Sequence, residues 1–515
     1  MDLPRISKPS QPAGLFGAAY VACCVLCLPL YMRNGYIGLI SGKFSLLLSL
    51  VAIGCAAAIV FFAFRKIPVV PGILQSGGSW LLVLCASYGA AAFFSTNRYT
   101  SIWGQLGRNN GLLLFLACTL LFFVVRLFFS PNFYPVMEAC ISYSVGIVAM
   151  LGWLNYWTID PFGVYYSVFE QDRHMFLSTI GNINFFGSFL CLFTPVSIGR
   201  ALRSRRTPDV ICAVAAMSAF VPANSDGAWI AAAVCILILL CTRLSADTFG
   251  QLCKLGVFCC LVWALNAFRS FFFAVQGPLR TVSAFVGALP VALVCGVILG
   301  LLYFANKKHT FPVHTFGIVL CTIAVVCVML GLIVRNLLGI SLGALDSIFF
   351  LDQTWGSNRG YLWFLLCIAY GRLPIIQKLF GAGGDIIYDL LNPHYTNYIV
   401  ALNGSTFDSA HNEFLQHLIC GGIVGLISWC GFLFSRIRAC SKYSPAFAFS
   451  LLCYAVQSFF SISMPAVFPI VFVFAAIGSC SHKTSAHATT QDNVFISLIS
   501  VLIVGVALII SQAIL

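Results

Sequence analysis

The sequence A-H-N-E-F-L-Q-H-L-I-C-G-G-I-V-G, at residues 410–425, joins a long polar segment to an apolar run. The apolar run continues to about residue 435, which gives it the length of a helix that crosses a bilayer. The polar segment before it, residues 335–412, is the longest part of the chain that could not lie in lipid. This contrast indicates a membrane protein whose polar residues are concentrated in one large loop.

The composition of the chain excludes a soluble fold. Its 515 residues are 60% hydrophobic and 8% charged, with a mean hydropathy of +0.97, whereas about 25% of the residues of a soluble domain are charged. We predict an all-α polytopic membrane protein with about 12–15 transmembrane helices in a single membrane domain, residues 1–515. The expected spans are at about 13–32, 44–64, 78–94, 110–125, 136–153, 183–199, 209–223, 227–242, 255–268, 282–305, 314–334, 413–435, 445–462, 465–480 and 494–514.

The basic residues follow the pattern of a membrane protein and not that of a nucleic-acid-binding protein. The net charge is +13, but Lys and Arg are dispersed in short loops between apolar runs, as the positive-inside rule requires. With the N-terminus in the cytoplasm, most of them are cytoplasmic, including the R-A-L-R-S-R-R run at 200–206. The first apolar run has no small-residue cleavage site, so we expect a first span and not a removed signal peptide.

The basic residues that remain would face the outside, and most of them are arginine. A guanidinium donates two parallel hydrogen bonds to a phosphate and keeps its charge when it is partly desolvated. Arg108, Arg359 and Arg372 are therefore candidates for phosphate contacts. Simple anchoring at the lipid headgroups is expected for Arg33, Lys43 and Lys378.

Within the large polar segment, residues 359–380 alternate basic side chains with Trp, Leu and Ile and are interrupted at Gly371 and Pro374. This pattern favours helices that lie in the membrane interface. The alternative is a re-entrant segment or a true span, which would invert the rest of the topology. The basic cluster at 436–442 argues against that alternative.

His411 is the candidate general base, because a histidine there could accept a proton near neutral pH. It precedes a helix expected to start near Phe414, which Asn412 could cap; it could equally be a loop histidine without a function. The G-A-G-G-D run at 381–385 lacks the Lys-Ser/Thr and the strand of a P-loop, so we interpret it as a tight turn. The acidic residues are scattered, and the 23 cysteines lie mostly in apolar runs. We therefore expect no metal and no cofactor.

Several motifs, in their order along the chain, resemble the O-antigen ligase and polymerase family of bacterial membrane glycosyltransferases. The most specific is the histidine-asparagine motif, A-H-N-E-F-L-Q-H-L-I-C-G-G-I-V-G-L at 410–426. The arginine-tryptophan motif is G-S-N-R-G-Y-L-W at 356–363, and a glycine turn ending in aspartate is L-F-G-A-G-G-D at 379–385. Further matches are G-R-N-N-G-L at 107–112, G-N-I-N-F-F-G-S at 181–188, G-A-W at 227–229 and A-V-Q-S-F-F-S-I-S at 455–463.

The resemblance implies a helical glycosyltransferase fold of the lipid-phosphosugar-dependent (GT-C) type in the bacterial plasma membrane. Such enzymes take a glycan from undecaprenyl pyrophosphate on the outer face of the membrane. They pass it to a hydroxyl of a second glycan, a lipid-anchored sugar or a protein, without a metal and with inversion at the anomeric carbon. Residues 335–412 would form the roof of the active site, and residues 413–515 would be the C-terminal spans.

On this resemblance, Arg359, Arg108 and Arg372 would bind the pyrophosphate and stabilise the charge that develops on it. His411 would take the proton of the acceptor hydroxyl. Asp226 is a departure, because many members carry an arginine just before G-A-W. Supporting roles are expected for Asn412, Glu413, Asp385, Trp363 and Gln457.

Two other functions remain open. A lipid-glycan flippase or transporter would be expected to show inverted repeats and ionisable residues in mid-span, whereas the spans here are nearly free of charge. A peptidoglycan polymerase of the shape-and-division family would have fewer spans and a functional aspartate in an external loop, and the 410–426 motif points away from it. The sequence does not distinguish a polysaccharide ligase from a polymerase or from an enzyme that glycosylates protein.

Overall fold

A computed structural model describes residues 11–64, 77–275, 277–308, 311–404, 406–480 and 490–514 of the chain. Within these ranges, nine helices are long and apolar enough to cross a membrane. They are α1 (Gln11–Leu30), α2 (Leu39–Ala63), α6 (Tyr134–Tyr156), α7 (Ile183–Ser204), α11 (Ala246–Arg269), α13 (Leu289–Lys308), α14 (Val313–Asn336), α19 (Glu413–Tyr443) and α22 (Thr490–Ile514).

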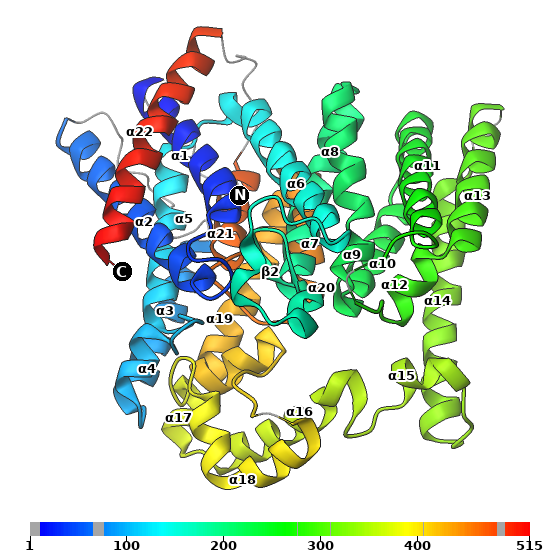
Figure 1. The fold of residues 1–515 in the computed structure, drawn as a ribbon. Coiled ribbons are helices and arrows are strands. Elements are labelled where there is room, and N and C mark those ends of the chain that lie inside the picture. The colour runs from blue at the N-terminus through cyan, green and yellow to red at the C-terminus, as the bar shows by residue number, and fades with distance from the viewer. Residues whose placement is uncertain are drawn as a thin grey trace.

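Shorter apolar helices complete the bundle (Figure 1). They are α3 (Ser79–Phe94), α5 (Leu112–Phe128), α8 (Thr207–Ser218) with α9 (Phe220–Ala223), α10 (Asp226–Leu240), α20 (Pro445–Ser458) and α21 (Phe468–Gly478). Each expected span corresponds to one of these helices, which confirms the prediction of an all-α polytopic membrane protein.

The remaining elements are short or belong to the large polar segment. The helices are α4 (Arg98–Trp103), α12 (Thr281–Gly287), α15 (Asp346–Phe349), α16 (Trp355–Arg372), α17 (Ile375–Phe380) and α18 (Ile387–Asn403). An antiparallel pair is formed by β1 (Phe176–Leu177) and β2 (Gly181–Asn182). Single 3-10 turns are η2 (Pro131–Phe133), η3 (Val164–Ser167), η4 (Glu170–Met175) and η5 (Gly343–Leu345).

The core of the bundle surrounds α21, whose residues Phe468–Gly478 are all buried. A helix that is apolar on every side can satisfy all its faces only when other helices surround it. Trp429 of α19 packs against Phe468 and Phe472 of α21 in tilted geometry, with its ring centroid 5.2 and 5.9 Å from theirs. The core thus fixes α19, the helix that follows the histidine-asparagine motif.

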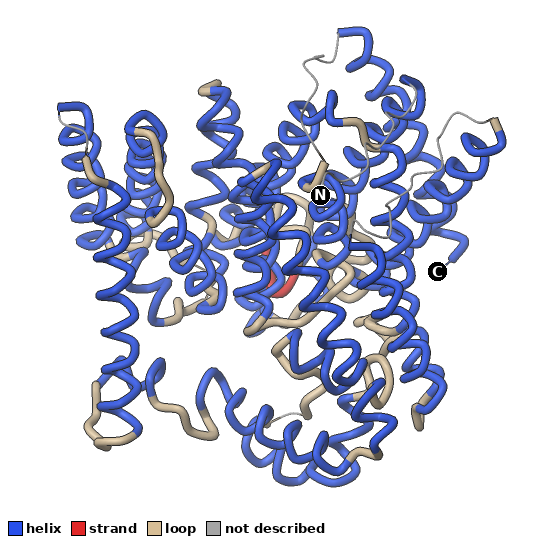
Figure 2. The backbone as a smooth tube through the Cα atoms, turned by 180° about the vertical axis from the view of Figure 1, so that it is seen from behind, coloured by secondary structure: helices blue, strands red, loops and turns tan. Residues whose placement is uncertain are grey.

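The helices of the large polar segment form a layer beneath one end of the bundle (Figures 1 and 2). The break between α16 and α17 falls at Leu373 and Pro374, where the sequence predicted an interruption. Pro374 ends the helix because a residue before proline is restricted to extended conformations, and Leu373 has ψ 146°.

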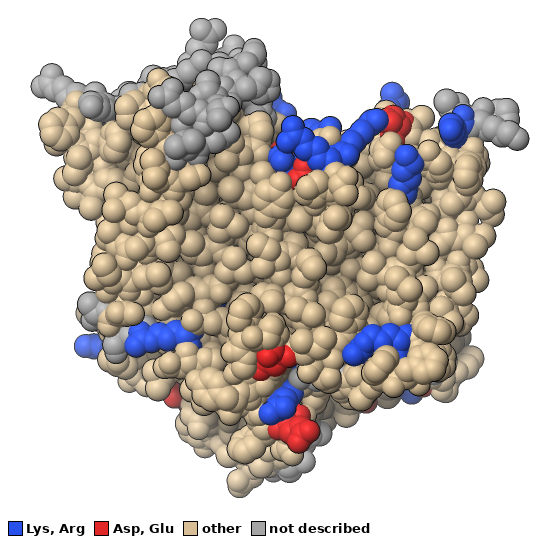
Figure 3. All heavy atoms as spheres, turned by 45° about the horizontal axis from the view of Figure 1, so that its top comes forward, with Lys and Arg blue, Asp and Glu red and all other residues tan. Residues whose placement is uncertain are grey.

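Charged side chains gather near the two ends of the molecule, and the broad zone between them carries few (Figure 3). At the end of α7, Arg200 pairs with Asp209 at 2.7 Å, and Arg203 and Arg205 pair with Glu138 and Asp247. Arg200 and Arg203 lie 17 and 20 residues after the start of α7 at Ile183, or about 26 and 30 Å along the helix. The 200–206 run and the start of α7 are therefore separated by roughly the thickness of a bilayer core.

The sequence suggested that Lys43 anchors at the lipid headgroups, and the structure shows that it does not. Its side chain is fully buried, and its Nζ donates hydrogen bonds to the carbonyl oxygens of Leu28 (2.7 Å) and Pro29 (2.8 Å). These carbonyls lie in the last turn of α1, where they have no partner within the helix and carry partial negative charge. The ammonium therefore caps a helix end.

Candidate functional site

Three segments far apart in the sequence meet around Arg108. Its Nη2 lies 3.1 Å from Oδ1 of Asp385, and its Nη1 lies 2.8 Å from Oδ1 of Asp408. Asp385 also accepts a hydrogen bond from the backbone N–H of Gln105 at 2.9 Å. One guanidinium thus joins the loop before α5, the glycine turn and the loop before α19.

The glycine turn has the tight geometry that the sequence indicated. Gly381 has φ +101°, and a Cβ there would clash with the carbonyl oxygen of Cys420. The turn lies against α19, where the N–H of Ala382 donates to the carbonyl of Ile419 at 2.9 Å. α19 is kinked at this level by Gly422, which has φ +67°. Only backbones without side chains could approach so closely, and this approach places Asp385 beside Arg108.

The pKa values of the Asp385 and Asp408 carboxylates shift in opposite directions. Burial raises the pKa of Asp385, whose side chain is fully buried, and Arg108 offsets part of that rise. Burial also raises the pKa of Asp408, but Arg108 and His411 outweigh it, so that the pKa falls below its usual value. Burial lowers the pKa of Arg108, but the two carboxylates outweigh it and raise the pKa. Arg108 therefore stays charged.

His411 is partly exposed beside this ion-pair cluster, with its backbone in the left-handed region at φ +46°. Burial lowers its pKa to about 4, with further lowering by Arg359 and Arg108 and an opposing effect of Asp408. The imidazole is consequently neutral at pH 7, which is the state in which it can accept a proton.

Arg359 lies at the start of the regular part of α16. Gly356, Ser357 and Asn358 before it all have positive φ, so the chain makes a left-handed turn that directs the helix. Arg359 donates to the carbonyl of Gly356 at 2.7 Å and to that of Phe460 at 3.2 Å, and its buried Nε has no hydrogen-bond partner among the described residues. Burial, and then Arg280, lower the pKa of Arg359 to about 10. It remains a cation at neutral pH.

Neighbouring side chains hold the loop that carries His411. Trp363 of α16 donates from Nε1 to the carbonyl of Ala410 at 2.9 Å, and the N–H of Ala410 donates to Oε1 of Gln416 at 2.9 Å. Asn412 caps α19 as expected, accepting from the N–H of Leu415 at 3.0 Å. The position of His411 is thereby fixed on both sides.

Glu413 and Gln457 make supporting contacts inside the bundle. The fully buried carboxylate of Glu413 accepts a hydrogen bond from the Tyr454 hydroxyl at 2.6 Å. Gln457 accepts from the Ser188 hydroxyl at 2.6 Å and donates to the carbonyl of Asn184 at 3.3 Å. Gln457 thus links the A-V-Q-S motif on α20 to the G-N-I-N motif on α7.

Arg372 lies apart from the other two candidate arginines. It is exposed at the last turn of α16, where its Nη1 donates to the Tyr395 hydroxyl at 3.0 Å. It follows Arg359 by 13 residues on one helix, which separates their Cα atoms by about 20 Å. The structure therefore does not bring Arg372 to the site formed by Arg108, Arg359 and His411.

Arg280, which the sequence did not single out, and Asp226, noted above only as a departure from the family pattern, lie beside Arg359. Arg280 pairs with Asp226 at 3.7 Å, and both affect the pKa of Arg359. Arg280 is held there because its N–H donates to Oδ1 of Asn224 at 2.7 Å, and Nδ2 of Asn224 donates to the carbonyl of Pro278 at 3.1 Å. Asp226, just before the G-A-W motif, thus pairs with an arginine from another loop.

The available sequence signals for these residues were weak. Arg280 was one of several outward-facing arginines, and nothing local separated it from the rest. Asp408 lies three residues before His411, but only the fold shows that it meets Arg108.

Half of the ten described non-glycine residues with positive φ lie in the loops of this site. Non-glycine residues in the left-handed region include Asn109, Ser357, Asn358, Asp385 and His411. They belong to the loops that meet around Arg108 and Arg359. Such conformations cost of order 1–3 kcal/mol each and tend to gather where a fold positions reactive groups.

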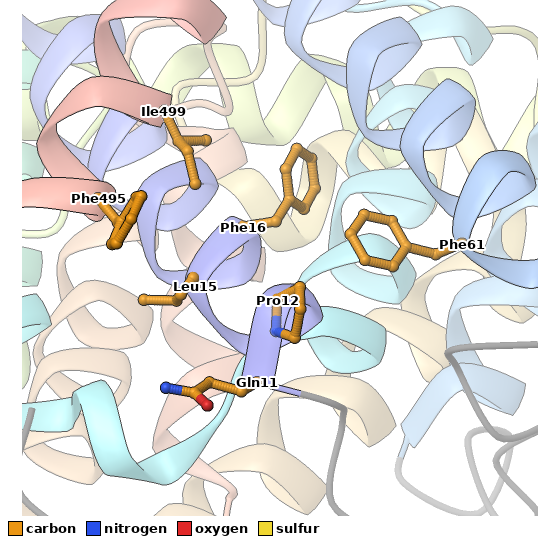
Figure 4. A pocket seen from close by; sticks show the side chains of 7 residues that line it. All are labelled: Gln11, Pro12, Leu15, Phe16, Phe61, Phe495 and Ile499. Carbon is orange, nitrogen blue, oxygen red and sulfur yellow. The ribbon is translucent and has the colours of Figure 1, made fainter. Parts of the chain in front are cut away.

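No group of three or more His, Cys, Asp or Glu side chains that could hold a metal occurs in the described parts of the chain. A pocket of about 440 Å³ lies elsewhere, between α1, α2 and α22, and its lining is nearly all apolar (Figure 4). It is lined by Gln11, Pro12, Leu15, Phe16, Phe61, Phe495 and Ile499. None of these residues takes part in the cluster around His411.

A comparison with protein families matches residues 279–430 to O-antigen ligase. The matched region contains Arg280, Arg359, Asp385, Asp408 and His411. A comparison with curated proteins finds no significant match. The family match agrees with the motifs quoted from the sequence and with the bundle of apolar helices. The chain is a multi-pass membrane protein, and its residues 279–430 match the O-antigen ligase family.

Proposed function

We propose that the protein transfers a glycan from undecaprenyl pyrophosphate to an acceptor hydroxyl on the outer face of the bacterial plasma membrane. The family match supports a membrane ligase or polymerase of glycans in general terms. The donor, the side of the membrane and the stereochemistry are the specific parts of the proposal. The observation that carries it is a neutral, partly exposed imidazole next to the buried Arg108 and the half-buried Arg359.

Arg359 and Arg280 are suited to hold the diphosphate. Only Asp226, 3.7 Å from Arg280, pairs with either of them among the described residues. The Nε of Arg359 is buried without a partner, so it has a donor to offer an anion. Arg108, by contrast, is neutralised by two carboxylates. In this proposal, Arg108 positions the loop of His411 and stabilises the phosphate charge less than Arg359 and Arg280 do.

The reaction is a single displacement. The acceptor oxygen attacks the anomeric carbon from the face opposite the pyrophosphate, and the bond from that carbon to the pyrophosphate oxygen breaks. The hydroxyl proton passes to the free ring nitrogen of His411, and undecaprenyl pyrophosphate leaves with the bonding electron pair. One displacement inverts the anomeric carbon. The guanidinium groups stabilise the charge that develops on the leaving group.

Donor binding would also adjust the base. In the free protein, burial and the neighbouring arginines hold the pKa of His411 near 4, which makes it a weak base. A pyrophosphate at Arg359 adds negative charge near the imidazole and raises the pKa of His411. The base would therefore approach its most effective range only when the donor is in place.

The topology proposed for this reaction has the N-terminus in the cytoplasm and residues 335–412 outside. In support, the 200–206 run begins about 26 Å along α7 from the end of the bundle near the candidate site. Residues 335–412 would roof the site within a single membrane domain, and residues 413–515 would form the C-terminal spans.

The test is glycan transfer by protein purified in detergent, with a lipid-linked oligosaccharide as donor and a glycan as acceptor. The product and the released undecaprenyl pyrophosphate are measured. We expect transfer by the parent and by Arg98→Ala, which alters an exposed arginine, and none by His411→Ala or Arg359→Ala. Full activity of either of these variants would remove that residue from the mechanism. A flippase would show no transfer without two compartments.

The surface glycans of a deletion strain would then decide the type of transfer. Accumulated lipid-linked single repeat units would indicate a polymerase. Accumulated long chains on the lipid carrier would indicate a ligase.

A further inference from the structure

Two arginines meet at the end of the bundle opposite the candidate site. α5 begins just after Arg108, and Arg126 lies 14 residues beyond its start at Leu112, or about 21 Å along the axis. α19 begins just after His411, and Arg436 lies 23 residues beyond Glu413, about 35 Å along the helix. The candidate site thus lies at the starts of α5 and α19, and Arg126 and Arg436 lie toward the other ends of the same two helices.

The two guanidinium groups converge on one hydroxyl. Nη1 of Arg126 lies 3.5 Å from Oγ of Ser479, and Nη1 of Arg436 lies 3.4 Å from the same atom. Arg126 also donates to the carbonyl of Ala476 at 3.4 Å and to Sγ of Cys480 at 3.1 Å. The exposed fractions of Arg126 and Arg436 are only 8% and 6%.

This pair of charges has no counter-charge in the described structure. No described carboxylate forms an ion pair with Arg126 or Arg436, and the buried Nε of Arg126 has no hydrogen-bond partner there. By sequence, neither 65–76 nor 481–489 contains Asp or Glu, and the acidic residues outside the described side chains are Asp2 and Asp492. At the end of α7, by contrast, Arg200 pairs with Asp209 at 2.7 Å.

Two buried cations that face each other are unfavourable unless an anion joins them. The carbonyl of Ala476 lies at the negative end of α21 and offsets part of one charge only. A tetrahedral oxyanion suits the arrangement, because each guanidinium can donate to it in a bidentate manner. The Ser479 hydroxyl donates to the carbonyl of Ala475 at 2.8 Å and offers the two arginines only its oxygen.

We propose that Arg126 and Arg436 bind a phosphate group beside Ser479. Arg126 lies in the last turn of the apolar helix α5, and Arg436 lies seven residues before the end of α19. The phosphate can come from an anionic lipid or from inorganic phosphate in solution. This site is separate from the glycan-transfer site and does not depend on that reaction.

The test measures the thermal unfolding midpoint of the full chain in a neutral detergent. Phosphatidylglycerol, phosphatidylcholine or inorganic phosphate is added at constant ionic strength. We expect the midpoint to rise by at least about 2 °C with a phosphate-bearing anion, since ligands that bind only the folded state stabilise it. A rise with phosphatidylglycerol alone identifies a lipid headgroup, and an equal rise with inorganic phosphate identifies the free anion.

Arg126→Gln/Arg436→Gln should lose this rise, and Arg438→Gln, which changes an exposed arginine on the same turn of α19, should keep it. If the double variant does not fold, Arg436→Lys retains the charge without the planar fork and should bind the same anion at least about tenfold more weakly. The proposal is wrong if neither anion stabilises the parent, or if the arginine variants respond as the parent does.

Discussion

Arg108 and Asp385 form a buried ion pair, with Nη2 and Oδ1 3.1 Å apart, that joins the loop before α5 to the glycine turn. Asp385 has no exposed side-chain surface, and Arg108 has 9%. The pair also reaches Asp408, at 2.8 Å from Arg108, three residues before His411. The position of the candidate base therefore depends on a carboxylate in the glycine turn.

Asp385→Asn should destabilise the protein and reduce glycan transfer. It leaves the buried Arg108 with one carboxylate partner in place of two, and breaking a buried ion pair costs roughly 3–5 kcal/mol. Asp247→Asn is the control, because Asp247 pairs with Arg205 in an exposed position, where an ion pair contributes roughly 0–1 kcal/mol. Unfolding in denaturant and transfer by the folded fraction are measured. Equal stability of the two variants would show that the Arg108–Asp385 pair does not hold the loops together.

The pH dependence of transfer should report on His411. The neutral imidazole is the active form, so activity is lost as the pH falls through its pKa. For the free protein, kcat/KM should fall near pH 4, well below the ordinary value of 6.5. Arg359→Gln removes a charge that lowers this pKa, so the pKa of His411 in that variant, followed by NMR and not by activity, should be higher than in the parent. Arg98→Gln should leave the pKa of His411 unchanged, and an unchanged value in Arg359→Gln would separate Arg359 from His411.

The parts of this molecule that follow from local sequence were predictable. Apolar runs determine helices because, in lipid, the backbone polar groups of each run must form hydrogen bonds with one another. The cap at Asn412 and the break at Pro374 depend on neighbouring residues only, and both occur as the sequence indicated.

Contacts between distant segments were not predictable in the same way. The pairing of Arg280 with Asp226 depends on how two loops are placed by the bundle. The separation of Arg372 from Arg359 depends on α16 running on as one helix between them. Lys43 is buried because the end of α1 happens to present free carbonyls beside it. Charge and residue type alone carry none of this information.

Arg280→Gln should weaken donor binding more than it slows the chemical step. Arg280 lies beside Arg359 and affects its pKa, and a lost guanidinium–phosphate contact costs about 1.5–3 kcal/mol. We expect KM for the lipid-linked donor to rise by about 10- to 100-fold, with a smaller change in kcat. Steady-state kinetics at varied donor concentration measure both constants. An unchanged KM would place Arg280 outside the diphosphate pocket.

Gly381→Ala should disrupt the approach of the glycine turn to α19. The substitution has two costs: φ +101° disfavours an L side chain, and the new Cβ would clash with the carbonyl oxygen of Cys420. Gly163→Ala is the control that separates the two costs, because Gly163 has φ +62° but no atom lies within 4 Å of the position of the added Cβ. The control should lose about 1–2 kcal/mol from backbone strain alone, and Gly381→Ala should lose at least about 1 kcal/mol more. Thermal unfolding compares the two variants, and transfer should fall only in Gly381→Ala, because only this change moves Asp385 away from Arg108. Equal unfolding midpoints with normal transfer would mean that the turn can shift without disturbing the site.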